Sequence, residues 1–236
     1  MTALENVDLT VRQGEFISLV GPSGCGKTTL LKMLSGLLPV TAGEIELDGR
    51  PVDGPRFDVG MVFQAPTLLP WRNIRGNVML PVEVRKLDRK VYGERADELL
   101  DMVGLKGFED RYPSELSGGM QQRAGICRAL VHNPGVLLMD EPFGALDAMT
   151  REFMNIELLR IWRESGKTVV LVTHSIPEAV FLSDRVVVMS PRPGRIVDVV
   201  DVDMPRPREL GMMQSDAAGA LVTRIRGHFN AQGSVD

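Results

Sequence analysis

The feature that most constrains this sequence is a glycine-rich stretch, GPSGCGKT, at residues 21–28. It follows an apolar run from Phe16 to Val20 that is typical of a buried strand. After it, residues 28–38 carry apolar side chains at helical spacing and stop before Pro39. The order of buried strand, glycine-rich loop and helix predicts an α/β fold with this loop at the end of a strand.

The same stretch matches the pattern G-x-x-x-x-G-K-[ST], which binds nucleotide phosphates in this context. Backbone N–H groups of such a loop face inward, and the helix N-terminus adds the positive end of its dipole. We expect Lys27 to reach the β and γ phosphates and the Thr28 hydroxyl to bind Mg²⁺. The alternative is an accidental glycine-rich turn with a surface lysine. The residues expected to hold the nucleotide are Gly21, Pro22, Ser23, Gly24, Cys25, Gly26, Lys27, Thr28 and Thr29.

Strand and helix signals alternate along most of the remaining chain. The opening residues alternate apolar and polar side chains up to a turn at Gly14, which predicts an additional strand before Phe16. Further elements are predicted as strands at residues 44–52, 136–140 and 168–174 and as a helix at 151–165. This alternation is typical of a parallel sheet covered by helices.

One region interrupts the alternation. From Pro66 to Arg128 the strand signals fade, and amphipathic helical segments replace them. We therefore predict a single domain that consists of an α/β core, residues 1–70 and 131–236, and an inserted helical subdomain, residues 71–130.

The proline-rich stretch beyond Ser190 predicts a small hairpin, followed by a polar helix with a frayed end. A solvated hairpin is favoured over a nucleic-acid patch for its arginines, which are Arg192, Arg195, Arg206 and Arg208. The net charge of -4 also argues against general affinity for phosphate backbones. We expect no nucleic-acid partner.

The chain shows no signal for a membrane span or a disulfide framework. No apolar run approaches the roughly 20 residues that cross a bilayer, and the first residues lack the regions of a signal peptide. Cys25 is expected to be a small spacer in the phosphate loop, and Cys127 is expected to lie in the core. These features predict a protein of the reducing cytoplasm that reaches a membrane only through partners.

Two adjacent acids, Asp140 and Glu141, follow the apolar run VLLM. In an open α/β sheet, ligands bind in the crevice outside the carboxyl ends of the strands. We expect Asp140 to hold Mg²⁺ and Glu141 to polarise the attacking water. Alone, such a pair is as readily explained by helix capping. Its combination with a phosphate loop favours the catalytic interpretation.

The segment LSGGMQQR, residues 116–123, provides a second candidate anion site far from the first in sequence. A Ser-Gly-Gly element that opens a helix presents free backbone N–H groups to an anion. An ordinary helix start capped by Ser117 is the alternative.

Together these segments resemble the ATP-binding subunits of ABC transporters over essentially the whole chain. Six elements occur in that family's order: the loop GPSGCGKT, Gln64 within VFQAP, the signature LSGGM, LLMDEP, the segment ALD ending at Asp147, and His174. The resemblance implies an ATP hydrolase that uses ATP and Mg²⁺. It also implies a P-loop (RecA-like) ABC nucleotide-binding domain with a mixed sheet and an inserted helical subdomain.

The resemblance further implies a head-to-tail dimer, most simply of two copies of this chain. Each ATP would lie between the phosphate loop of one subunit and Ser117, Gly118 and Gly119 of the other, and Asp147 would organise the seam. Gln64 is then expected to touch Mg²⁺ and the attacking water.

His174 is expected to contact the γ phosphate. Without the family's motif order, it would be interpreted as an ordinary, partly buried histidine.

Three stretches, FQAPTLLPWRNI, EPFGALDAMTRE and VMSPRPGRIV, resemble most closely the subgroup that energises uptake of nitrate, sulfonates, taurine and similar solutes. This implies an importer motor at the cytoplasmic face of the cell membrane, with integral-membrane permease subunits as partners and, indirectly, a solute-binding protein. Trp71 and Arg72 are either a contact for a membrane subunit or part of a packed loop. The alternative functions are a lipid or export cassette, or a non-transport ATPase in translation or DNA maintenance.

The sequence departs from the family at its adenine contact. Members usually carry an aromatic residue that stacks on adenine, upstream of the segment that resembles ALENV. No aromatic residue precedes Phe16, and Phe16 itself is expected in the core. The departure predicts nucleotide binding that is weaker and less selective for the base than in relatives with that residue.

Overall fold

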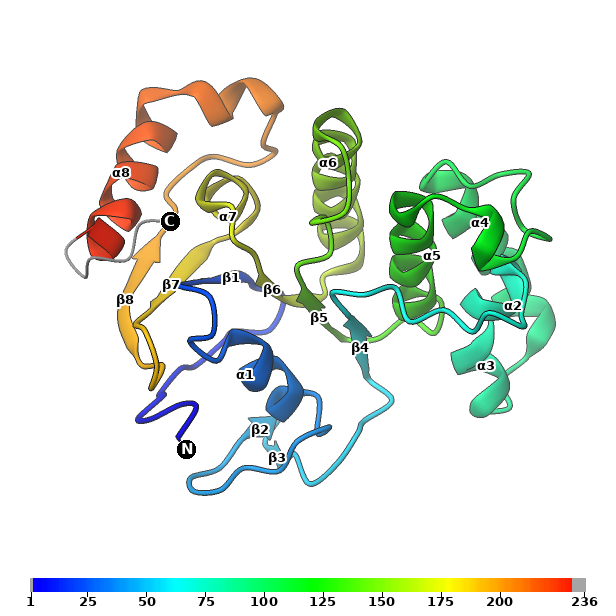
Figure 1. Cartoon of the computed structure of the whole chain (residues 1–236), viewed down its shortest axis with the longest axis horizontal. Helices are drawn as coiled ribbons and strands as arrows, with labels where there is room; N and C mark the ends of the chain where they lie inside the picture. The colour runs from blue at the N-terminus through cyan, green and yellow to red at the C-terminus, as the bar shows by residue number, and fades with distance from the viewer. Residues whose placement is uncertain (1, 231–236) are drawn as a thin grey trace.

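The computed structural model describes residues 2–230, and its centre is a six-stranded sheet (Figure 1). The strand order is β4-β5-β6-β1-β7-β8, and all neighbours are parallel except β7 and β8. The strands are β1 (Phe16–Val20), β4 (Val59–Val62), β5 (Val136–Asp140), β6 (Thr168–Val172), β7 (Arg185–Met189) and β8 (Ile196–Asp201). Every residue of β1 and β5 is buried, because both lie inside a sheet that is covered on both faces. The predicted α/β fold with a mixed sheet is confirmed.

Helices cover both faces of this sheet (Figure 1). One face carries α1 (Lys27–Leu34) and the small hairpin of β2 (Glu46–Leu47) and β3 (Arg50–Pro51), and the other carries α6 (Ala148–Ser165), α7 (Ile176–Leu182) and α8 (Asp216–Asn230). In β1, Ile17 and Leu19 pack on the α1 side, whereas Phe16 packs edge-on against Trp162 of α6 with ring centroids 6.0 Å apart. The predicted core position of Phe16 is confirmed.

Four helices lie together beyond the β4 edge of the sheet (Figure 1). They are α2 (Ile74–Val78), α3 (Leu80–Val84), α4 (Arg89–Met102) and α5 (Gly118–Leu130), with a 3₁₀ turn at Pro113–Glu115. The four helices contact one another, and α5 also contacts β4. Cys127 of α5 is fully buried as predicted, and burial raises the pKa of its thiol to about 12. The exact division into a core and a helical subdomain stays a prediction.

Three elements differ clearly from the sequence-based prediction. The predicted strand at 44–52 is instead the hairpin of β2 and β3, which turns at Asp48 and Gly49 and lies outside the main sheet. Residues 2–13 do not form a strand: within the described chain their backbone pairs only at the Leu4–Gly194 bridge, and their apolar side chains pack on the α1 face instead. Helix α1 ends at Leu34, short of the predicted Leu38. It stops there because Gly36 adopts a φ of 73° in close contact with Gly54, where a Cβ atom would lie 2.1 Å from the carbonyl oxygen.

The segment after Ser190 forms β8, which extends the main sheet, and then a 3₁₀ turn at Leu210–Gln214 before α8. Arg192 and Arg195 are exposed as predicted. The predicted frayed end lies partly at residues 231–236, outside the described residues. Helix α8 is less polar than predicted, because Ala218 and Ile225 are buried in the core.

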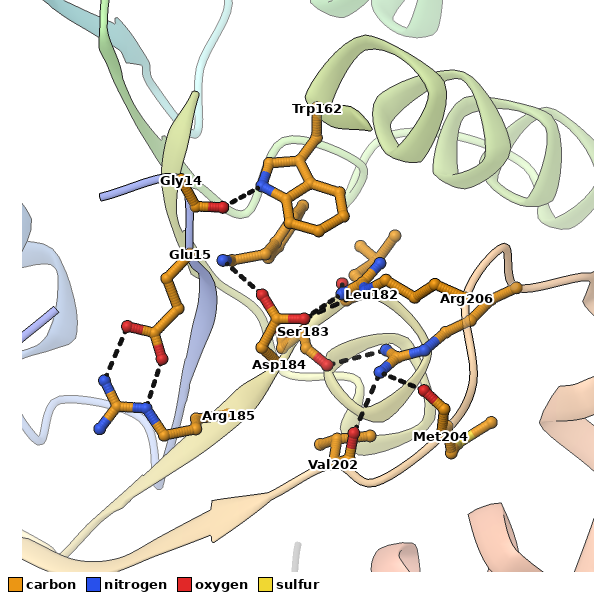
Figure 2. Close-up of polar contacts among 12 residues, drawn as sticks. Gly14, Glu15, Trp162, Leu182, Ser183, Asp184, Arg185, Val202, Met204 and Arg206 are labelled. Carbon is orange, nitrogen blue, oxygen red and sulfur yellow. Dashed lines mark hydrogen bonds and ion pairs between the residues drawn. The ribbon is translucent and has the colours of Figure 1, made fainter. Parts of the chain in front are cut away.

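The prediction of solvated side chains is wrong for Arg206 and Arg208. Arg206 donates from Nε and Nη2 to Oδ1 of Asp184, at 3.0 and 2.8 Å, and its guanidinium lies 4.1 Å from the centroid of the Trp162 ring (Figure 2). Arg208 is buried and donates to the carbonyl oxygens of Val180, Phe181, Ser183, Val202 and Met204. Burial lowers the pKa of Arg208 to about 10. The last carbonyls of α7 have no helical donor, and a guanidinium supplies five N–H donors to such a site.

Among residues 2–230, no helix is long and apolar enough to cross a membrane.

Candidate active site

The predicted catalytic residues follow the carboxyl ends of neighbouring parallel strands. β1 leads into the phosphate loop, β4 into Gln64, β5 into Glu141 and β6 into His174. Because these four strands are parallel neighbours, their ends meet at one edge of the sheet, which is where α/β folds bind ligands.

The phosphate loop between β1 and α1 depends on glycine conformations and close contacts. Gly24 and Gly26 have φ values of 75° and 108°. A Cβ atom at Gly26 would lie 2.7 Å from the Leu4 side chain, and one at Gly21 would lie 3.0 Å from the Met189 carbonyl oxygen. The glycines therefore let the loop pack tightly against its surroundings. The loop leads directly into the N-terminus of α1, where free backbone N–H groups and the helix dipole favour an anion.

Lys27 lies across this loop and is only 5% exposed. Its Nζ donates to the carbonyl oxygens of Gly21 at 2.7 Å and Pro22 at 3.0 Å, and it is 3.7 Å from Sγ of Cys25. Cys25 is fully buried beneath the loop, consistent with a spacer role. The ammonium group is thus held at the loop, where phosphate oxygens can replace its carbonyl partners.

Thr28 and Asp140 bring two oxygen donors together beside the loop. The Thr28 hydroxyl donates to Oδ1 of Asp140 at 3.1 Å. Asp140 is 3% exposed, and burial raises its pKa although Thr28 and nearby cations lower it in part. In the described part of the chain, no group of three or more His, Cys, Asp or Glu residues could hold a metal. A hydroxyl and one carboxylate suit Mg²⁺, which keeps waters and phosphate oxygens as its other ligands.

Glu141 is contacted by both other predicted catalytic side chains. Nε2 of Gln64 donates to its Oε2 at 3.1 Å, and Nε2 of His174 lies 2.5 Å from its Oε1. Glu141 also has a φ of 48°, a left-handed conformation that is unfavourable for a residue with a Cβ atom. Such a conformation at the end of a buried strand is typical of functional sites.

The loop of Gln64 is attached to the helical group. The buried Gln122 of α5 donates to the Phe63 carbonyl oxygen at 3.2 Å, and Arg128 of α5 donates to the carbonyl oxygens of Pro66 and Thr67 at 2.9 and 2.8 Å. A movement of α5 would therefore be transmitted directly to the loop of Gln64.

The signature element and Asp147 lie at two helix starts. Ser117 caps α5 by accepting from Met120 N–H at 3.3 Å, and Asp147 caps α6 by accepting from Thr150 N–H at 3.0 Å. Ser117 and Gly118 are exposed, and a Cβ atom at Gly119 would lie 3.1 Å from the Leu146 side chain. Capping thus describes what Ser117 and Asp147 do within one chain, and it leaves the exposed Ser117 and Gly118 accessible to a second subunit.

The two residues proposed for membrane contact differ in their surroundings. Trp71 is 71% exposed, so the packed-loop interpretation is wrong for this side chain. Arg72 is engaged within the chain, because its Nη1 donates to Glu83 at 2.6 Å and to the Gly76 carbonyl oxygen at 3.4 Å.

One buried polar cluster near the site escaped the sequence-based prediction. Glu178, Asn155 and Thr173 are each at most 4% exposed, and they lie next to the segment of His174. The only signal in the sequence was the spacing of Ser175 and Glu178, which is typical of a capping box.

A phosphate loop between β1 and α1, with the buried Asp140 and the partly buried Glu141 at the end of β5, defines a P-loop nucleotide hydrolase. Residues 4–144 match the family described as ABC transporter. The chain belongs to the ABC transporter family, as an ATP-hydrolysing cassette.

Relatives are similar over most of their length. An uncharacterized ABC transporter ATP-binding protein of Methanocaldococcus jannaschii is 53% identical over 207 residues, which cover 88% of this chain and 78% of that protein. The taurine import ATP-binding protein TauB of Ruegeria pomeroyi is 50% identical, covering 82% of this chain and 72% of TauB. TauB of Escherichia coli O157:H7 is 47% identical, covering 86% and 80%. The predicted resemblance to the nitrate, sulfonate and taurine subgroup is confirmed.

Solved structures share the fold. The ATP-binding cassette MJ0796, in a dimeric post-hydrolysis state bound to ADP and Pi, has a TM-score of 0.77 and 35% sequence identity. The match covers 86% of this chain and 92% of that chain. A second dimeric structure of MJ0796 has a TM-score of 0.78 and 36% identity.

Proposed function

We propose that this chain is the ATP-hydrolysing motor subunit of an importer for a small solute of the nitrate, sulfonate or taurine type. The relatives named for taurine import support this class of solute. In this proposal the chain works at the cytoplasmic face of the cell membrane, bound to separate permease subunits that receive solute from a binding protein. One observation supports ATP hydrolysis at this site most directly: the side chains of Gln64 and His174 both contact the Glu141 carboxylate.

The phosphate loop would bind the β and γ phosphates of ATP. Backbone N–H groups at the start of α1 face the anion, and Lys27 exchanges the carbonyl oxygens of Gly21 and Pro22 for phosphate oxygens. Thr28 and Asp140, with Gln64 nearby, would hold Mg²⁺, which when bound neutralises charge on the phosphates.

Glu141 would act as the general base of hydrolysis. Its carboxylate accepts a proton from water as the water oxygen bonds to the γ phosphorus. The bond from that phosphorus to the β–γ bridging oxygen breaks, and ADP and phosphate leave. Gln64 orients the water, and His174 turns from Glu141 toward the γ phosphate. Both side chains are exposed, so they can change partners without unfolding the sheet.

A complete site would need a second copy of the chain. Ser117 and Gly118 are exposed at the N-terminus of the thirteen-residue helix α5, which lies beyond the β4 edge of the sheet, whereas α1 lies on a face of the sheet (Figure 1). The dimeric structures of MJ0796 support pairing with a second cassette. In the proposed head-to-tail pair, each Ser-Gly-Gly element faces the partner's phosphate loop. Asp147 would lie at the seam.

The proposal is tested by purifying the Glu141→Gln variant from detergent-solubilised cells with ATP and Mg²⁺. Slow hydrolysis should hold the closed assembly, so a multi-span permease should co-purify. Lys27→Ala is the matched control, because a variant that binds ATP poorly should recover less permease. Recovery of ribosomal or DNA-repair proteins without a permease would contradict the transport function and leave the ATPase standing.

A further inference from the structure

A buried carboxyl group lies directly behind the segment that carries His174. Glu178 of α7 is 4% exposed. Its Oε2 accepts a hydrogen bond from the Thr173 hydroxyl, and the Asn155 side chain lies beside the same carboxyl. We name residues 173–175 the switch segment. Burial of a carboxyl group is costly unless hydrogen bonds offset it, so the contacts of Glu178 must hold it firmly in place.

Helix capping does not explain Glu178. The spacing of Ser175 and Glu178 is that of a capping box, in which the glutamate returns to the N–H of the cap residue. Here Ser175 already caps α7 through its hydroxyl, which accepts from Glu178 N–H at 3.3 Å. The Ser175 N–H donates instead to the Thr173 hydroxyl oxygen at 3.0 Å. The Thr173 hydroxyl therefore links Glu178 to the backbone on both sides of His174.

His174 itself has little else to fix it. Its side chain is 51% exposed, and its Nε2 contacts the Glu141 carboxylate. The imidazole therefore takes its position from the backbone of the switch segment more than from packing. The contacts that hold this backbone decide where Nε2 lies.

The opposite side of the Glu178 carboxyl faces α6. Burial raises the pKa of Glu178, and Thr173, Arg151 and Asn155 each lower it in part. Asn155 is 3% exposed. Arg151, one turn earlier on α6, donates to the carbonyl oxygens of Phe143 and Leu146 at 3.3 and 3.0 Å, in the loop after Glu141. One helix thus contacts both the loop after Glu141 and the carboxyl behind His174.

We infer that Glu178 is a positioning residue for His174: through the Thr173 hydroxyl it fixes the switch segment against α6, so that the imidazole stays in register with Glu141. The inference rests on the proposed function, in which His174 acts in hydrolysis. Glu178 does not touch ATP. Its effect reaches the reaction only through the switch segment.

The test compares steady-state ATP hydrolysis by the full chain and its variants. Glu178→Ala should lower kcat by about tenfold or more and change KM for ATP by less than about twofold, since small displacements of a catalytic group are costly. Thr173→Val removes the donor of the same hydrogen bond, so it should lower kcat by a similar factor. Glu178→Gln, which still accepts from Thr173, should keep most of kcat. Ser183→Ala is the matched control, because Ser183 is equally buried at the end of α7 and its hydroxyl contacts Ser18.

A double-mutant cycle with His174→Ala decides whether Glu178 acts through His174. If it does, Glu178→Ala lowers kcat no further in the His174→Ala background. Multiplied losses, or a Glu178→Ala variant with wild-type kcat, would overturn the inference while leaving the proposed function intact. If His174→Ala alone kept wild-type kcat, the proposed role of His174 would fail and this inference with it. If Glu178→Ala does not fold, Thr173→Val takes its place in the cycle.

Discussion

Nε2 of His174 lies 2.5 Å from Oε1 of Glu141, and these residues come from the ends of neighbouring strands β6 and β5. The second carboxylate oxygen accepts from Gln64 at 3.1 Å. A carboxylate oxygen has two acceptor lone pairs, so each can still accept a hydrogen bond from water. The arrangement places an amide and an imidazole around one carboxylate beside the phosphate loop. The following predictions test this site and the fold that supports it.

Trp71 is exposed on the surface of the helical group, and we expect it to serve assembly and not hydrolysis. Trp71→Ala should leave ATP hydrolysis by the free chain unchanged, because this exposed side chain is not one of the predicted nucleotide-binding or catalytic residues. The same variant should lose co-purification with the permease, since exposed tryptophans often anchor interfaces. Val197→Ala, on β8, is the control for removing an exposed apolar side chain. Unchanged assembly of the Trp71 variant would remove the contact role.

Arg208 is expected to be a major contributor to stability. Arg208→Met would leave five carbonyl oxygens without their donor, and we expect a loss of about 3 kcal/mol in the free energy of unfolding. Arg195→Met removes an exposed ion pair with Glu5 and should cost less than about 1 kcal/mol. Equilibrium unfolding in urea measures both. Equal losses would show that burial of Arg208 does not matter for stability.

Glu178 should make stability depend on pH. Burial raises its pKa above the ordinary value of 4.5, so the folded chain holds this proton more tightly than the unfolded chain. Its contribution is full below the unfolded pKa and is lost as pH rises through the folded pKa. Glu178→Gln cannot ionise, so its stability relative to wild type should increase as the pH rises above the ordinary glutamate pKa of 4.5.

The control for this pH series is Glu152→Gln. Glu152 lies on the neighbouring helix α6, but its side chain is exposed. The pH series of Glu178→Gln is compared with that of this surface variant. A constant difference between Glu178→Gln and wild type would mean that Glu178 ionises in the folded chain as it does in the unfolded one.

The sequence predicted those parts of the molecule that depend on local patterns. The phosphate loop could be placed between a strand and a helix because its glycines and the apolar segments on either side are contiguous in the sequence. Glu141 and His174 could be assigned to one edge because each lies at the carboxyl end of a predicted strand and parallel strands end together. Strand β4, which precedes Gln64, was not predicted, and Gln64 was identified only through the family resemblance. Their mutual distances required the structure.

The predictions that were wrong concern residues whose partners lie far away in the sequence. Residues 2–13 alternate like a strand, but in the described structure they pair with other backbone only at the Leu4–Gly194 bridge. Arg208 lies among prolines in sequence, and only the fold supplies the end of α7 as its partner. Glu178 has the spacing of a capping residue, yet its carboxyl binds Thr173 and faces α6. None of these partners is readable from neighbouring residues.

The most direct test of the central claim is the rate of phosphate release by the Glu141→Gln variant with ATP and Mg²⁺. We predict a fall of about a hundredfold or more, because general-base catalysis contributes at least that factor, with ATP affinity within about twofold of wild type. Glu152→Gln should keep the wild-type rate. A Glu141→Gln variant that hydrolyses ATP at the wild-type rate would contradict the assignment of Glu141 as the base of this site.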